Sequence, residues 1–284
     1  MKTKITKLKE VGFCYGVKRA IDLMTQTAAE NRAVDCLGEL VHNPPVMQKL
    51  HSMGIRIIKS AAEIASPVAA ISAHGVSPQI EAEMRSKPVK ILDTTCPSVK
   101  AVQKAVARLV KNGYFIILFG DPNHAEVKGL VGWADNRAIV TTDSEKGFDD
   151  LPAGRKFGIV SQTTQVPEKY LAFVKDLLDK LMTGNKEITI LDTVCQEVRR
   201  RQQSSKELAG QSDLMVVVGG RNSANCRRLV EICSPLVETH AVENADEIDS
   251  TWVKGKRSIG VTSATSASQE SIDAVIARLE SMTE

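Results

Sequence analysis

Short apolar runs of strand length recur along the whole chain and alternate with longer amphipathic stretches. Runs such as 114–119 (YFIILF) and 214–218 (LMVVV) lack alternating polar residues, which is typical of parallel strands covered on both faces. The stretch 99–113 (VKAVQKAVARLVKNG) repeats valine and leucine at helical spacing and ends at Gly113, as amphipathic helices do. This alternation predicts an α/β fold with mostly parallel sheets. The predicted strands are 55–58, 68–73, 89–93, 114–119, 138–142, 157–161, 187–192, 214–218 and 258–262.

Two of the predicted strands end in nearly the same six letters, ILDTTC at 91–96 and ILDTVC at 190–195, 99 residues apart. Both lead into helical stretches, and a third cysteine, Cys14 in VGFCYGVKRAI, also precedes one. Three cysteines that each precede a helix predict three similar α/β units, each donating one cysteine from the edge of its sheet. The predicted units are 1–96, 97–193 and 194–284, the last ending in a C-terminal helix.

These three cysteines suggest a metal site. A cysteine at a helix N-terminus is favoured as the thiolate, because free backbone N–H groups and the helix dipole stabilise the anion. Three converging thiolates could hold an iron–sulfur cluster, and a 4Fe–4S cluster with three cysteine ligands leaves one iron open as a Lewis acid. The alternative is that they are small buried residues, which cysteine often is. The other cysteines lack the strand-to-helix position and are expected in the core: Cys36, Cys226 and Cys233.

Polar side chains gather just beyond the carboxyl ends of the predicted strands, where open α/β sheets bind ligands. Imidazoles, hydroxyls and an amide beside helix N-termini suit a phosphate or diphosphate, and no GxxxxGK[ST] or GxGxxG motif indicates a nucleotide. Each hydroxyl could instead only cap a helix. Glu126 is the one acid among them and is a candidate proton donor if it faces a bound substrate. The candidates are His42, His74, His124, Glu126, Gln162, Thr163, Thr164, Ser223, Asn225 and Ser266.

Composition and charge argue against nucleic acid and membrane as partners. A net charge of +3 and 4% aromatic residues give neither a strongly basic nor a stacking surface. The apolar runs are of strand length and the first residues lack a signal-like apolar segment, so we expect a cytoplasmic protein that does not span a membrane. Six cysteines without a CxxC pair are then expected as thiols or metal ligands rather than disulfides. The basic triplet at 199–201 is expected on a solvated helix face.

Short motifs in a fixed order carry a resemblance to a known family. They are GFCYGVKRAI, VHNPPVMQKL, SAHGVSP, DTTCPSVKAV, NHAEVKG, SQTT, DTVC and GGRNSAN. Together they resemble the LytB/IspH family from about residue 12 to residue 266, nearly the whole chain. Members of that family are 4-hydroxy-3-methylbut-2-enyl diphosphate reductases, the last enzymes of the methylerythritol phosphate route to isoprenoids. The resemblance implies three α/β domains around a central 4Fe–4S cluster.

The resemblance also implies roles for individual residues of this chain. Glu126 matches the proton-delivering acid, and Thr163 matches a threonine near the substrate hydroxyl. The cluster ligands are matched by Cys14, Cys96 and Cys195. The diphosphate pocket is matched by His42, His74, His124, Ser223, Asn225 and Ser266.

The implied reaction is a reductive dehydroxylation of an allylic diphosphate at the open iron, which yields isopentenyl and dimethylallyl diphosphate. An external donor such as ferredoxin or flavodoxin is implied, because the chain has no flavin or nicotinamide motif of its own. Two alternatives remain open at this point. One is a divergent relative that reduces another allylic or activated substrate on the same iron, and the other is a non-catalytic iron–sulfur protein that senses redox state or binds a partner.

The third unit departs from the family pattern at two places. The family continues its third cysteine as C-N-A-T or similar, whereas this chain has CQEV, so Val198 stands at a hydroxyl position. Gln196 and Glu197 are also new, and Glu197 would bring negative charge toward the cluster or the diphosphate if it pointed inward. The family's late AGAS[TA]P is here SATSAS, with Ala264 and Ser268 for glycine and proline. These differences are expected to bear on the substrate more than on the redox chemistry.

Overall fold

The computed structural model describes residues 3–31, 33–146, 148, 151, 156–182 and 186–283. Its strands are β1 (Lys4–Lys7), β2 (Val34–Leu37), β3 (Ile55–Ile58), β4 (Val68–Ile71), β5 (Lys90–Asp93), β6 (Phe115–Phe119), β7 (Ala138–Thr141), β8 (Lys156–Ser161), β9 (Glu187–Ile190), β10 (Leu214–Val218), β11 (Thr239–Val242) and β12 (Ser258–Ser263). Its helices are α1 (Tyr15–Asn31), α2 (Pro44–Ser52), α3 (Pro78–Arg85), α4 (Pro97–Lys111), α5 (Ala125–Trp133), α6 (Pro167–Leu181), α7 (Gln196–Ala209), α8 (Ala224–Cys233), α9 (Ser250–Val253) and α10 (Gln269–Thr283). Within these ranges, no helix is long and apolar enough to cross a membrane.

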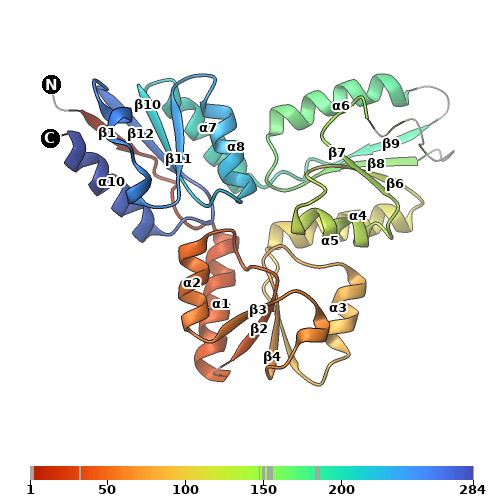
Figure 1. Cartoon of the computed structure of the whole chain (residues 1–284). Coiled ribbons are helices and arrows are strands. Elements are labelled where there is room, and N and C mark those ends of the chain that lie inside the picture. The colour runs from red at the N-terminus through yellow and green to blue at the C-terminus, as the bar shows by residue number, and fades with distance from the viewer. Residues whose placement is uncertain are drawn as a thin grey trace. The chain divides into compact units, whose positions relative to one another are not determined.

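The strands form three four-stranded sheets in which every pairing is parallel (Figure 1). The strand orders are β3-β2-β4-β5, β7-β6-β8-β9 and β11-β10-β12-β1. Parallel sheets with helices between their strands confirm the predicted α/β class of three similar units. All of the predicted strands are present, with ends that differ by at most two residues.

The three sheets share one order of strands. In each sheet the strand that we call the first (β2, β6 or β10) lies between the second (β3, β7 or β11) and the third (β4, β8 or β12). A fourth strand lies at the edge beside the third. In the sheet that contains β10, β11 and β12, the N-terminal strand β1 takes this fourth place. The predicted unit 1–96 is therefore wrong for residues 4–7, because β1 pairs with β12, with Lys4 opposite Ser258. Pairing satisfies the N–H and C=O groups along the edge of β12 that would otherwise stay open.

The chain folds as two compact units. The terminal unit consists of Met1–Arg19, Val41–Ser52 and Gln196–Glu284, and it contains the sheet β11-β10-β12-β1. The central unit consists of Ala20–Leu40 and Met53–Cys195, and it contains the other two sheets. Apart from the N-terminal strand, the boundaries 1–96, 97–193 and 194–284 stay a prediction.

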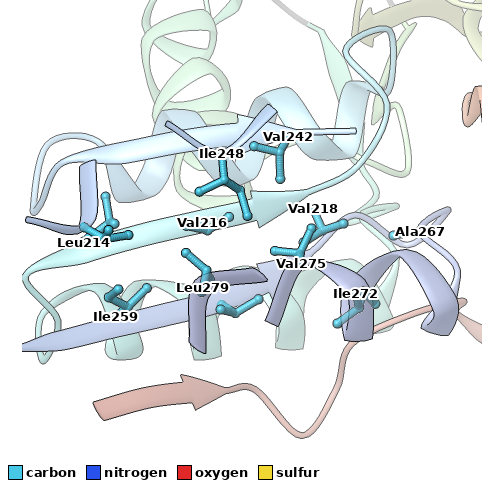
Figure 2. Close-up of a cluster of buried hydrophobic side chains, with 12 residues drawn as sticks. Leu214, Val216, Val218, Val242, Ile248, Ile259, Ala267, Ile272, Val275 and Leu279 are labelled. Carbon is cyan, nitrogen blue, oxygen red and sulfur yellow. The ribbon is translucent and has the colours of Figure 1, made fainter. Parts of the chain in front are cut away.

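The core of the terminal unit shows why β10 is apolar at every position. Leu214, Val216 and Val218 pack against α10 on one face of the sheet, as Figure 2 shows. Met215 and Val217 belong to clusters on the other face, with residues of α7 and α8. Because side chains alternate along a strand, a strand covered on both faces needs an unbroken apolar run.

Strand β6 of the central unit follows the same rule. Ile116 and Leu118 pack against α4 and α5, whereas Ile117 and Phe119 pack against α6. The parallel strands all end at the same edge of their sheet, so the loops that follow them gather there. The first strands β2, β6 and β10 lead into α2, α5 and α8, and the fourth strands β5, β9 and β1 lead into α4, α7 and α1.

Candidate active site

Each predicted cluster cysteine lies between a fourth strand and the helix that follows it. The backbone N–H of each cysteine donates to a carbonyl in the loop after the third strand of the same sheet. The same main-chain bond therefore occurs in all three sheets, and it fixes each cysteine beside a loop that carries a predicted pocket residue. The bonds run from Cys14 to Thr265 (3.1 Å), from Cys96 to Ala73 (3.0 Å) and from Cys195 to Thr163 (2.9 Å).

The cysteines fall into two groups by environment. The three at the helix starts are half-buried, whereas the others are buried, as predicted for core residues. Burial raises the pKa of the thiols of Cys36 and Cys226 to about 12 and that of Cys233 to about 11. Such thiols stay protonated at neutral pH and are poor metal ligands.

Two of the half-buried cysteines, Cys96 and Cys195, lie near one another within the central unit. Burial raises the pKa of the Cys96 thiol, the N–H groups of Ser98 and Val99 lower it, and the charge of Cys195 raises it. The hydroxyl of Ser98 lies 3.4 Å from the Sγ of Cys195. A thiol at a helix N-terminus with N–H groups directed at it, as at Cys96, fits a group that prefers soft, anionic ligands, such as an iron–sulfur cluster.

Glu126 lies at the start of α5, where its side chain is 2% exposed. Its Oε1 accepts a hydrogen bond from the backbone N–H of Thr163 (2.7 Å), and its Oε2 accepts one from the Thr163 hydroxyl (2.8 Å). The carbonyl of Thr163 is the one that accepts from the N–H of Cys195. Thr163 thus connects the buried acid Glu126 to the backbone of Cys195, a predicted cluster ligand.

Burial also sets the protonation of Glu126. Loss of solvent raises the pKa of the carboxyl to about 7, although both bonds from Thr163 lower it. An acid whose pKa lies near neutrality holds a proton that it can still give up, which is what general acid catalysis requires. A strongly shifted carboxyl in a cluster of polar groups is typical of a functional site.

His124 and His74 lie together beside this acid. His124 is the N-cap of α5, and its Nδ1 accepts a hydrogen bond from the backbone N–H of Glu126 (3.2 Å). Because a backbone N–H can only donate, Nδ1 carries no proton and the neutral ring has its proton on Nε2. The ring of His74 packs edge-on against that of His124, with the centroids 5.4 Å apart. Imidazole donors held in this way suit an anionic ligand.

In the terminal unit, His42 and Ser266 lie beside neighbouring loops. The side-chain amide of Asn43 donates to the carbonyl of Ser266 (2.9 Å), which ties the loop before α2 to the loop after β12. A Cβ built on Gly220 would clash with the carbonyl oxygen of His42, so only glycine lets the loop before α8 come so close. His42 itself is half-buried.

Ser223 and Asn225 lie at the start of α8. The hydroxyl of Ser223 accepts from the N–H of Cys226 (3.3 Å), so this serine caps the helix. Asn225 is 2% exposed, yet neither atom of its amide has a hydrogen-bond partner among the described residues, and nor does the hydroxyl of Ser266. Buried polar groups are nearly always satisfied, so these atoms indicate a missing polar ligand.

The first departure from the family pattern, CQEV at 195–198, does not direct the carboxylate of Glu197 inward. Val198 is buried in α7. The side chain of Glu197 is half exposed and lies 3.8 Å from Arg200 in an i,i+3 pair at the surface. Gln196 is exposed as well.

The structure accommodates the second departure, SATSAS at 263–268, through close packing. Ala264 is fully buried, and a Cβ built on Gly219 would clash with its methyl group, so that glycine makes room for the alanine. The hydroxyl of Ser268 accepts a hydrogen bond from the N–H of Ser271 (3.1 Å), close to the first residues of α10. Neither substitution introduces a charge.

Sequence reasoning missed Asn43 and misplaced Arg201. Asn43 is the residue between His42 and two prolines, a position typical of a helix cap, which could have drawn attention to it. The triplet 199–201 was expected on a solvated face, but Arg201 is 3% exposed. Helical spacing explains this, because Arg201 lies on the same face of α7 as Val198, Ser205 and Leu208, all buried.

The fold and the residues at the strand ends together define a class: an α/β enzyme with a buried acid that is linked through Thr163 to the backbone of a cysteine. The model of the family described as LytB protein matches residues 5–280, and the chain belongs to this family. Proteins of the family are iron–sulfur reductases of isoprenoid biosynthesis.

Relatives and solved structures agree with this assignment. The chain is 43% identical over 278 residues, 98% of each chain, to a 4-hydroxy-3-methylbut-2-enyl diphosphate reductase of Dehalococcoides mccartyi (strain CBDB1). It is 38% identical over 277 residues, 97% of each chain, to the reductase so named of Pelobacter propionicus. The structure of the Plasmodium falciparum E-1-hydroxy-2-methyl-but-2-enyl-4-diphosphate reductase superimposes with a TM-score of 0.89 at 27% identity, covering 98% of this chain and 88% of that one. A second reductase structure, of the terminal enzyme of the non-mevalonate pathway, gives a TM-score of 0.72 at 33% identity, covering 99% and 100%.

Proposed function

We propose that this chain is a 4-hydroxy-3-methylbut-2-enyl diphosphate reductase that yields isopentenyl and dimethylallyl diphosphate. Family membership supports the reaction type, and relatives of that name align over nearly the whole chain. The observation that carries the proposal is the bonding of Thr163, which holds the buried acid Glu126 on one side and the backbone of Cys195 on the other.

Cys14, Cys96 and Cys195 would hold a 4Fe–4S cluster. Their support is the shared position after a fourth strand, the shared main-chain bond and the effect of Cys195 on the pKa of Cys96. When bound, a cluster with three cysteine ligands supplies electrons and one open iron that acts as a Lewis acid.

The diphosphate would be bound by imidazoles, hydroxyls and one amide. His124 presents an Nε2–H donor, because its Nδ1 accepts from the backbone. The amide of Asn225 and the hydroxyl of Ser266 are buried without partners among the described residues, so they can bind phosphate oxygens without giving up another bond. The proposed set is His42, His74, His124, Ser223, Asn225 and Ser266.

Glu126 would deliver the proton that lets the hydroxyl leave. The C–O bond breaks, the hydroxyl leaves as water, and a proton is added to an allylic carbon. The reaction therefore consumes two electrons and two protons for each molecule of water released. Thr163 orients the carboxyl through both of its oxygens, which holds its proton in a fixed direction. The electrons would come from an external carrier such as ferredoxin or flavodoxin in the cytoplasm.

Turnover of the named substrate tests this proposal. Anaerobically reconstituted protein is assayed with 4-hydroxy-3-methylbut-2-enyl diphosphate and a strong one-electron donor, beside Glu126→Gln. The amide keeps the shape of the side chain but cannot donate an acidic proton, so turnover should fall by about 100-fold or more. Glu168→Gln, at an exposed position in the first turn of α6, is the matched control and should keep its rate. Wild-type turnover no higher than that of Glu126→Gln would overturn the proposal.

A further inference from the structure

Arg201 is a buried guanidinium with an unusual set of partners. Its Nη1 donates to the carbonyl of Gly12 (2.8 Å), to the carbonyl of Ser263 (3.1 Å) and to the Ser263 hydroxyl (3.4 Å). Its Nε has no hydrogen-bond partner, and no carboxylate of the described residues pairs with it. The neighbouring Arg200 behaves in the ordinary way, with a side chain that is 70% exposed and paired with Glu197.

A buried cation that contacts only neutral groups is costly unless an anion lies nearby. Burial lowers the pKa of Arg201, and the group that opposes this most is Cys14, ahead of Glu197 and Glu10. The electrostatic effect of Cys14 thus raises the pKa of Arg201 against the effect of burial.

The other two cysteine helices lack such a charge. Arg201 lies six residues after Cys195, and the corresponding residues after Cys14 and Cys96 are Ala20 and Val102. Both are buried and apolar, so the position as such does not need a cation. Among the three helices that follow these cysteines, α7 is thus the one with a buried cation at this position.

The groups that Arg201 contacts belong to two functional loops. Gly12 lies two residues before Cys14 with φ +82°, and its N–H donates to the hydroxyl of Ser263 (2.8 Å). Ser263 ends β12, three residues before Ser266. Arg201 therefore binds the turn that carries a proposed cluster ligand and the loop that carries a proposed diphosphate ligand.

We propose that Arg201 is a positioning residue that holds the Cys14 turn against the Ser266 loop, and that its charge offsets the negative charge of a cluster bound at Cys14. The charge part rests on the proposed iron–sulfur function, whereas the positioning part does not. A nearby buried cation stabilises the more negative, reduced state of a cluster and so raises its reduction potential.

Variants separate the two parts. Arg201→Gln keeps a hydrogen-bond donor but removes the charge, so the reduction potential in an EPR-monitored titration should fall. Arg201→Lys keeps the charge but loses the planar fork, so its potential should stay near that of the wild type while KM for the diphosphate rises several-fold. Arg200→Met, one residue away at the surface, should change neither quantity. A wild-type potential in Arg201→Gln would overturn the charge part.

Amide hydrogen exchange in the cluster-free protein tests the positioning part independently of iron. Exchange at residues 12–14 and 263–266 should quicken in Arg201→Lys and Arg201→Gln, and should be unchanged in Arg200→Met. Unchanged exchange in both Arg201 variants would overturn it. Wild-type protein that takes up no iron would overturn the proposed function and the charge part together, and would leave the exchange result to decide the positioning part.

Discussion

At the scale of the single residue, burial determines what Glu126 can do. The carboxyl is 2% exposed, and its pKa is raised to about 7 by loss of solvent. Thr163 donates to both oxygens, so the carboxyl keeps one orientation whether or not it is ionised. The burial that supports the proposed role of Glu126 as a proton donor should also make its ionised carboxyl unfavourable for folding at high pH.

The stability of the cluster-free protein should therefore depend on Glu126 and pH. In the folded state the carboxyl keeps its proton up to about pH 7, which is its raised pKa. In the unfolded state it loses the proton near its ordinary pKa of 4.5. Between these pH values the folded state binds more protons, so its stability falls as pH rises and the loss is complete above pH 7. Relative to Glu126→Gln, the wild type should lose roughly 3 kcal/mol between pH 4 and pH 8. Urea unfolding of both proteins at both pH values measures this, and equal slopes against pH would contradict it.

At the scale of the element, most strands could be predicted and a few could not. Runs such as β10 are visible because a strand buried on both faces must be apolar throughout. β1 and β11 are four-residue strands with polar positions, and β2 contains the buried Asp35, so their composition does not mark them. The pairing of β1 with β12 joins opposite ends of the chain, and no local pattern encodes it.

The candidate site was predictable to a similar extent. Position after a strand and family motifs pointed to Glu126 and the histidines, because chemistry-bearing residues gather at one edge of a parallel sheet. Asn43 and Arg201 were not predicted, because their positions matter only through contacts with distant loops. Asn43 contacts Ser266, and Arg201 contacts Gly12 and Ser263. Such contacts arise only when distant segments meet.

The strand-to-helix cysteines should differ sharply from a core cysteine when replaced. Cys14→Ala, Cys96→Ala and Cys195→Ala should each lose most of the iron and visible absorbance of the reconstituted protein. Cys36→Ala, in the middle of β2, should keep both, because its buried thiol has a pKa of about 12 and stays protonated. Iron analysis of the four variants makes the comparison. Equal iron content in all of them would remove the ligand assignment.

The loop before α8 should depend on a glycine. In Gly220→Ala the new Cβ would clash with the carbonyl of His42 and push the two loops apart, so KM for the diphosphate should rise more than kcat falls. Gly210→Ala is a matched control at the end of α7, where a Cβ meets only ordinary contacts. Steady-state kinetics of both variants test this, and an unchanged KM in Gly220→Ala would show that the approach of the loops does not matter.

At the scale of the whole molecule, one topology is used three times. In each sheet the strands have the same order, and the loop after β1, β5 or β9 carries a cysteine whose N–H donates to the loop after the neighbouring strand. The N-terminal strand completes the sheet formed by the C-terminal part of the chain. The repetition gives three loops of equivalent origin, and we propose that their cysteines hold one cluster at which the diphosphate is reduced.

The EPR spectrum of the one-electron-reduced, reconstituted protein tests this claim most directly. It is recorded with and without 4-hydroxy-3-methylbut-2-enyl diphosphate, and with isopentenyl diphosphate as a ligand that lacks the hydroxyl. We expect a cluster signal that the hydroxylated substrate changes and that differs from the signal with isopentenyl diphosphate. A cluster signal that is the same in all three samples would contradict it.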